Sequence, residues 1–175
     1  MSNLTLLFVF IVFTLLGCGG GKNKSTASTP PVGGKVTTKI TTFNIIGSSD
    51  ADNGVIPINA GIDNGKFKVE WEVISSENYD VDLYLSNDKY LSDKTDIVFS
   101  ALICGSSPSS SPCTHTASLD CKFSSTNKIS CGSNNQEKDL SSFLNALPQQ
   151  AFIIIEVCDS SYKSCKVSSQ AVELN

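Results

Sequence analysis

The stretch 66–73 constrains the fold more than any other part of the chain. Phe67, Val69, Trp71 and Val73 alternate there with lysines and glutamates. A period of two is typical of a β-strand that turns one face to the core and the other to water. Strands with one wet face belong to antiparallel sheets. The sequence therefore predicts a half-buried antiparallel strand over 66–73.

Several other segments favour strands, so we expect an all-β domain. In 79–86, Asp80 and Asp82 alternate with apolar residues, which repeats the pattern of 66–73. Further strands are expected at 36–46, 97–104, 116–123, 129–131, 152–158 and 166–174. We expect 129–131 to pair back onto 116–123. The run 152–158 is strongly apolar, and we expect it to be a central strand.

One segment favours a helix. Asp139 can cap a helix over 140–147, in which Leu140, Phe143, Leu144 and Leu147 share one face. Pro148 would end it. The sequence predicts a short crossover helix ahead of the central strand.

The chain opens with an uncharged apolar run, Leu4–Leu16. Thirteen residues of helix reach about 20 Å, which is short of a hydrocarbon core of about 30 Å. This length is typical of a secretion leader. The Gly-, Ser-, Thr- and Pro-rich stretch that follows predicts a flexible tether. We therefore divide the chain into a signal peptide (1–17), a tether (18–35) and a β domain (36–175).

The residues Leu15-Leu16-Gly17-Cys18 resemble the lipobox of bacterial lipoproteins. The resemblance implies cleavage after Gly17 and diacylglycerol on the Cys18 sulfur, which would anchor the protein to a membrane through its N-terminal lipid. Gly19 is not the Asp that retains such lipoproteins at the inner membrane, so the resemblance implies a cell-envelope protein at the outer membrane.

Six further cysteines follow the leader, and we expect disulfides because a secreted chain meets an oxidising compartment. They are Cys104, Cys113, Cys121, Cys131, Cys158 and Cys165. Six cysteines allow fifteen pairings. The spacings of nine, ten and seven residues favour bridges between nearest neighbours. A Cys metal site needs closer ligand pairs and partner histidines. His115 is the only histidine, so we expect no metal and no cofactor.

Parts of 36–174 resemble fibronectin type III and bacterial Ig-like adhesion domains. Phe67–Val73 with Trp71 resembles the Trp-bearing strand B, and Tyr79–Ser86 resembles strand C. Asp88, Asp93 and Asp96 resemble an acidic turn of the adhesion-type domains, and 144–148 resembles the corner before strand F. The resemblance implies a β-sandwich that acts as a binding or spacer module, without catalytic residues. The stretch 104–131 is longer than the family's usual connection.

Composition excludes some classes of partner. The chain has thirteen lysines, no arginine, seventeen acidic residues and a net charge of −4. Without a basic stripe, nucleic acid is not an expected partner.

Motifs for catalysis are missing from the sequence, which has no Gly-x-Ser-x-Gly, His-Glu-x-x-His or Gly-rich phosphate loop. Asp50–Gly54 resembles the start of a calcium loop, but Gly54 and Gly61 stand at the wrong positions for an EF-hand. We interpret it as a polar turn.

The sequence therefore favours a non-catalytic binding, adhesion or structural module, with a protein or glycan partner. A small periplasmic hydrolase or sugar-processing enzyme is the alternative. The loops between Cys104 and Cys113 and between Cys158 and Cys165 are candidate recognition loops, although loop stabilisation explains the bridges as well.

Overall fold

The computed structural model of the chain describes residues 38–92, 95–105, 113, 116–132 and 136–175. They form ten strands and one 3-10 turn, η1 (Asp63–Gly65), and contain no α-helix. The strands are β1 (Lys39–Ile46), β2 (Ile56–Ile58), β3 (Lys66–Ile74), β4 (Tyr79–Ser86), β5 (Ile97–Cys104), β6 (Thr116–Ser124), β7 (Lys128–Cys131), β8 (Lys138–Asp139), β9 (Gln149–Asp159) and β10 (Cys165–Leu174).

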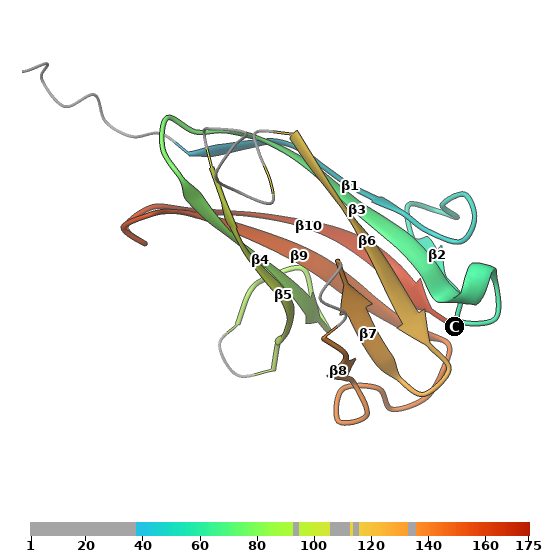
Figure 1. Ribbon diagram of the computed structural model, residues 1–175. Helices are drawn as coiled ribbons and strands as arrows, with labels where there is room; N and C mark the ends of the chain where they lie inside the picture. The colour runs from blue at the N-terminus through green and yellow to red at the C-terminus, as the bar shows by residue number, and fades with distance from the viewer. Residues whose placement is uncertain (1–37, 93–94, 106–112, 114–115, 133–135) are drawn as a thin grey trace, which may run out of the picture. The chain divides into compact units, whose positions relative to one another are not determined.

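The strands form two five-stranded sheets that pack as a β-sandwich (Figure 1). One sheet has the order β1-β3-β6-β7-β8, and the other has the order β2-β10-β9-β4-β5. The all-β prediction is thus confirmed. All pairs are antiparallel except one, because β2 pairs in parallel with the end of β10. We expected an antiparallel sandwich, and this parallel pair is the one departure from it.

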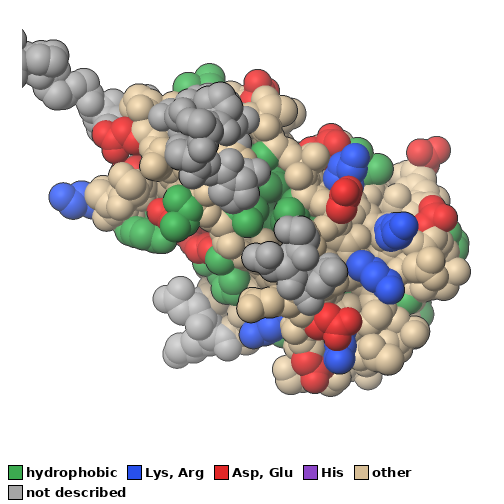
Figure 2. Space-filling view, viewed as in Figure 1, with side chains coloured by type: hydrophobic (Ala, Val, Ile, Leu, Met, Phe, Trp, Pro, Cys, Tyr) green, Lys and Arg blue, Asp and Glu red, His purple; other side chains and the backbone are tan. Residues whose placement is uncertain are grey.

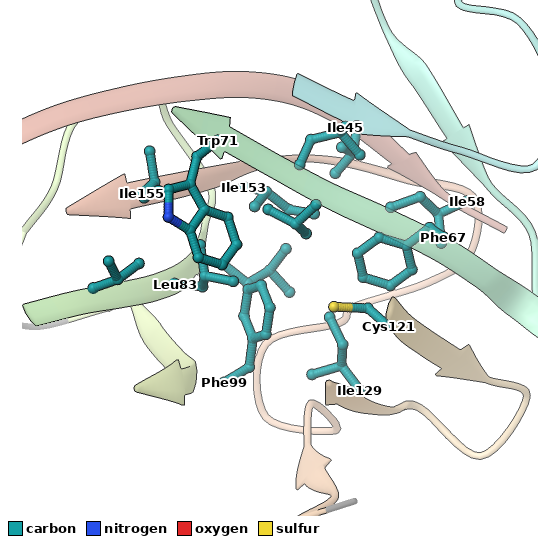
Figure 3. Packing of buried hydrophobic residues seen from close by; sticks show 14 of the residues in the cluster. Ile45, Ile58, Phe67, Trp71, Leu83, Phe99, Cys121, Ile129, Ile153 and Ile155 are labelled. Atoms are coloured by element: carbon teal, nitrogen blue, oxygen red, sulfur yellow. The ribbon is translucent and has the colours of Figure 1, made fainter. Parts of the chain in front are cut away.

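The core lies between the two sheets and is built from the apolar rows that the alternation predicts. Trp71 on β3 is 2% exposed, and Leu83 and Ile155 are fully buried. Figure 3 shows these side chains converging from β3, β4 and β9, with Phe67 and Cys121 beside them. Because successive side chains in a strand point to opposite faces, the charged residues between them lie on the outer faces. Trp71 is a core residue, as its place in the pattern predicts.

β9 is the central strand of its sheet, as predicted. It pairs with β10 on one side and β4 on the other. Both of its faces are covered over much of its length, and Ile153, Ile154 and Ile155 are fully buried. A run of β-branched residues suits this position, since a strand buried on both faces need not alternate.

The predicted helix over 140–147 was wrong. The segment forms turns and bends, with a single helical backbone bond from the Leu144 N–H to the Leu140 carbonyl, 2.9 Å long. Asp139 accepts the Ser141 N–H instead of capping a longer helix. The turn already buries Leu140 and Phe143. The helix is disfavoured by Ser141, Ser142 and Asn145, whose side chains hydrogen-bond to the nearby backbone in non-helical conformations. The two apolar residues are buried without it.

All three disulfides join the predicted nearest neighbours. Cys104–Cys113, Cys121–Cys131 and Cys158–Cys165 have Cα separations of 4.8, 4.1 and 4.0 Å. The second and third bridges join residues directly opposite in neighbouring strands. Loops this short are expected to contribute about 2–4 kcal/mol each to the free energy of unfolding.

The side chain of Gln170 joins the two sheets at one edge. Its Oε1 accepts the Ile45 N–H at 2.7 Å, and its Nε2 donates to the Phe43 carbonyl at 3.1 Å. Gln170 belongs to β10, and both partners belong to β1 in the other sheet. The side-chain amide of Gln170 therefore forms two hydrogen bonds with edge strand β1 of the kind that the backbone of a neighbouring strand would form.

We expect Gln170→Ala to destabilise the protein by about 1–3 kcal/mol, because it leaves two partly buried backbone groups unpaired. Denaturant unfolding with the disulfides intact measures this loss. Gln150→Ala, at an exposed position of β9, is the control and should change stability by less than about 0.5 kcal/mol. Equal effects of the two substitutions would contradict the role of Gln170.

Candidate functional site

The outer face of the second sheet carries a cluster that we name the carboxylate face: Asp80, Asp82, Tyr84, Glu156 and Tyr162. The first three come from β4, Glu156 comes from β9, and Tyr162 lies in the β9–β10 turn. β4 and β9 are neighbours, and Asp82 lies directly opposite Glu156 in their register. Sheet pairing thus brings together residues that are more than seventy positions apart.

The carboxylates repel one another. Across the described part of the chain, the only salt bridge joins Lys128 to Glu137, so none of the lysines there neutralises this cluster. Partial burial raises the pKa of Asp82, and the charges of Glu156 and Asp80 raise it further. Like charges directly opposite in a sheet cost about 0.2–1 kcal/mol. The arrangement therefore lowers stability.

One tyrosine hydroxyl of the carboxylate face is hydrogen-bonded to a carboxylate. Tyr84 donates to Oε2 of Glu156 at 3.0 Å. Desolvation raises the pKa of Tyr162, and the interaction with the nearby carboxylate of Asp80 raises it further. The bond from Tyr84 orients Glu156 but does not neutralise it.

Tyr162 is presented by a rigid turn. It has a φ of 54°, in the left-handed region that non-glycine residues rarely adopt, and its side chain is 63% exposed. Oδ1 of Asp159 accepts the Ser161 N–H and Oγ–H and the Lys163 N–H, and the bond from the Ser161 side chain is the main reason for the lowered pKa of Asp159. The Cys158–Cys165 bridge closes the base of the turn. Unfavourable backbone angles persist where the surroundings enforce them, which is typical of functional sites.

Exposed apolar side chains flank the carboxylate face. Ile103 on β5 is 65% exposed, and Val167 on β10 is 48% exposed. Ile103 lies opposite Asp80 and Val167 lies opposite Glu156, so both are on the outer side of the sheet. The surface thus combines negative charge with aromatic and aliphatic contact area.

The outer face of the first sheet has a different character. Lys66, Lys68 and Lys122 line an open groove of about 850 Å³ together with Asp120. Lys68 lies opposite Asp120 in the register of β3 and β6. Figure 2 shows basic and acidic side chains interleaved on the visible side of the molecule. Compared with this mixed surface, the carboxylate face is distinctive because no lysine of the described residues forms a salt bridge with it.

The structure brings together few of the other candidate residues. The segment 50–54 belongs to a tight turn, in which Asp52 and Val55 exchange backbone bonds of 3.0 and 2.9 Å across Asn53 and Gly54. Asp88 accepts the Tyr90 N–H and Asp96 accepts the Ser92 N–H, so both serve local loop structure. Cys18, Asp93 and His115 lie outside the described residues.

Glu156 lies close to Cys158 and Cys165. The two sulfurs are joined in a disulfide and offer no thiolate to a metal ion. Sequence reasoning missed the role of Glu156, although a single charge inside the apolar run 152–158 was a usable signal.

No protein-family model, curated protein or solved structure matches this chain. Within the described residues, no helix has the length and apolar character needed to cross a membrane.

We expect Asp82→Asn to stabilise the protein by about 0.2–1 kcal/mol at pH 7, because it removes a repulsion between opposite positions. A carboxyl whose pKa is raised in the folded state lowers stability when ionised, and protonation relieves this loss as the pH falls. The gain should therefore shrink from pH 7 toward about pH 4. Denaturant unfolding at both pH values measures it.

Asp120→Asn is the matched control, since Asp120 lies opposite a lysine. It should give no gain at pH 7. A destabilised Asp82→Asn protein would contradict the repulsion.

Proposed function

We propose that this protein is a non-catalytic binding module of the bacterial envelope, and that the carboxylate face recognises its partner. The observation that carries the proposal is the opposed pair Asp82 and Glu156, with which none of the nine lysines in the described part of the chain forms a salt bridge. An arrangement that lowers stability and has no folding role is typical of functional sites.

The chemistry of the face indicates a protein partner that presents lysine or arginine beside apolar groups. Charge complementarity speeds association and disfavours wrong partners. Tyr162 supplies a rigid, exposed aromatic side chain of the kind that is enriched at interfaces. Ile103 and Val167 add apolar area at the rim.

We further propose that the sandwich is of the Ig-like or fibronectin type III-like kind. The order β1-β3-β6 and the order β5-β4-β9-β10 correspond to strands A, B, E and C′, C, F, G of such domains. Trp71 on β3 and the corner before β9 then stand where the sequence resemblance puts strands B and F. The β7–β8 extension is additional to that pattern.

The lipobox supports a lipid anchor at Cys18 and an outer-membrane location. The tether 18–35 would carry the domain clear of the membrane surface. Two or three acyl chains give an effectively permanent attachment, because each buried methylene contributes about 0.8 kcal/mol.

We expect Cys18→Ser to abolish acylation. Mass measurement of the purified wild-type protein should show the chain from Cys18 onward with the added mass of the lipid, and the variant should lack that mass. The variant should also leave the membrane fraction of lysed cells. An unmodified wild-type N-terminus would contradict the anchor.

The binding face is tested by a photo-reactive amino acid in place of Tyr162 in the native cell. We expect a discrete adduct with a partner protein, because this side chain projects from the proposed face. The adduct should be lost in the triple variant Asp80→Asn, Asp82→Asn and Glu156→Gln, which removes charge and keeps shape. In isolated envelopes, 1 M salt should weaken it, since salt screens exposed charges.

Tyr90 provides a matched control position, because it is 67% exposed and lies outside the carboxylate face. The same photo-reactive group there should not give this adduct. Identical adducts at both positions, or an adduct indifferent to the triple variant, would refute the proposed face.

A further inference from the structure

We propose that the carboxylates of the second sheet protect the Cys158–Cys165 disulfide against reduction by thiols. This inference goes beyond the proposed function, because it concerns the chemistry of a bond within the chain and not the binding of a partner. It rests on the positions of Asp80 and Glu156 beside the two sulfurs.

The disulfide lies on the same side of the sheet as the carboxylates. Cys158 follows Glu156 by two positions in β9, so both side chains point outward. In the register of the sheet, Cys158 stands between Asp80 on β4 and Cys165 on β10. A carboxylate oxygen of Glu156 and the two sulfurs lie within 4.8 Å of one another. Two carboxylates therefore border the bond.

The positive charges of this region are fewer than the negative ones. Lys166 follows Cys165 directly, and its register partner is Val157, so it stands on the inner side of the sheet. Lys163 belongs to the turn beyond the bridge, where its N–H is bonded to Asp159, a further carboxylate. Within the described part of the chain, neither lysine forms a salt bridge. Carboxylates therefore outnumber ammonium groups around the bridge.

Reduction begins when a thiolate attacks one sulfur of the bridge. The thiolate forms a bond with Sγ of Cys165, the more exposed cysteine, and Cys158 leaves as a thiolate. A second thiolate attacks the reagent sulfur of this mixed disulfide, releases the thiolate of Cys165 and forms the disulfide of the reagent. The two cysteine thiolates then take up the two protons that the reagent thiols lost. One bridge is reduced, and two reagent thiols are oxidised.

The carboxylates oppose this reaction at two points. They repel the negative charge of the incoming thiolate, and they destabilise the charge that develops on the departing Cys158 sulfur. A thiolate that also carries an ammonium group has no net charge, so it is repelled less. Anionic thiols such as glutathione therefore reduce this bridge slowly, and the turn that carries Tyr162 stays closed at its base.

The test measures the reduction rate of each bridge in the folded, full-length protein. Cysteamine serves as the cationic thiol and 2-mercaptoethanesulfonate as the anionic one. Alkylation followed by mass spectrometry of peptides resolves the three bridges, and each rate is expressed per thiolate and relative to an uncharged model disulfide. We expect cysteamine to reduce Cys158–Cys165 about tenfold faster than the sulfonate at low salt. At 1 M salt this preference should largely disappear, because exposed charges are screened.

The variant Asp80→Asn with Glu156→Gln removes the two nearest charges and keeps the shape of the side chains. Its preference for cysteamine should fall about threefold or more, chiefly because the sulfonate reacts faster. If the substitutions merely opened the turn, both thiols would gain by the same factor and the preference would remain. That result would overturn the proposal. Asp120→Asn removes a carboxylate from the other sheet and should leave the preference unchanged.

The Cys121–Cys131 bridge is an internal control. It also joins directly opposite residues, and Lys66, Lys68 and Lys122 line the groove beside Cys121. This bridge should show no preference for cysteamine. Equal preferences at the two bridges, or equal rates of the two thiols at Cys158–Cys165, would contradict the proposal. Such a failure would leave the proposed binding function standing, because the readout is reduction of a bond and not association with a partner.

Discussion

The packing of the apolar row of β3 against the rows of β4 and β9 is the interaction on which the structure depends. Trp71 and Phe67 from one sheet meet Leu83 and Ile155 from the other, and all four are buried. Burial of apolar area is the dominant favourable term in folding. The three disulfides and Gln170 act on a sandwich that this packing already defines: the bridges close short loops, and the glutamine joins β10 to the edge strand β1 of the other sheet.

The same packing makes the outer surface available for recognition. Because β4 and β9 are held from the inner side, the outer positions of Asp80, Asp82 and Glu156 are not needed for the core. The chain places mutually repelling carboxylates there and orients Glu156 with the hydroxyl of Tyr84. A well-buried sheet tolerates this local loss of stability. The bridged turn adds Tyr162 at a backbone angle that a flexible loop would not maintain.

Alternation identified β3 and β4 because the relevant signal is local to each strand. The same reasoning missed β2 and β8, which are too short to show a period. It also predicted a helix over 140–147 from the spacing of four apolar residues. That spacing indicates which side chains are buried, but it does not require a helix. A turn buries Leu140 and Phe143 as well as a helix would. The cysteine spacings predicted the bridges correctly, since residues this close meet readily across a hairpin.

By itself the sequence determined the longer strands, the core positions of residues such as Trp71, the bridge partners and the central place of β9, because each follows from local pattern or composition. Tertiary structure alone decided that Asp82 faces Glu156, that Gln170 reaches β1, and that β2 runs parallel to β10. These relationships depend on which strands become neighbours and in what register. The hydrophobic pattern of a strand specifies its buried face, but it does not specify its neighbour.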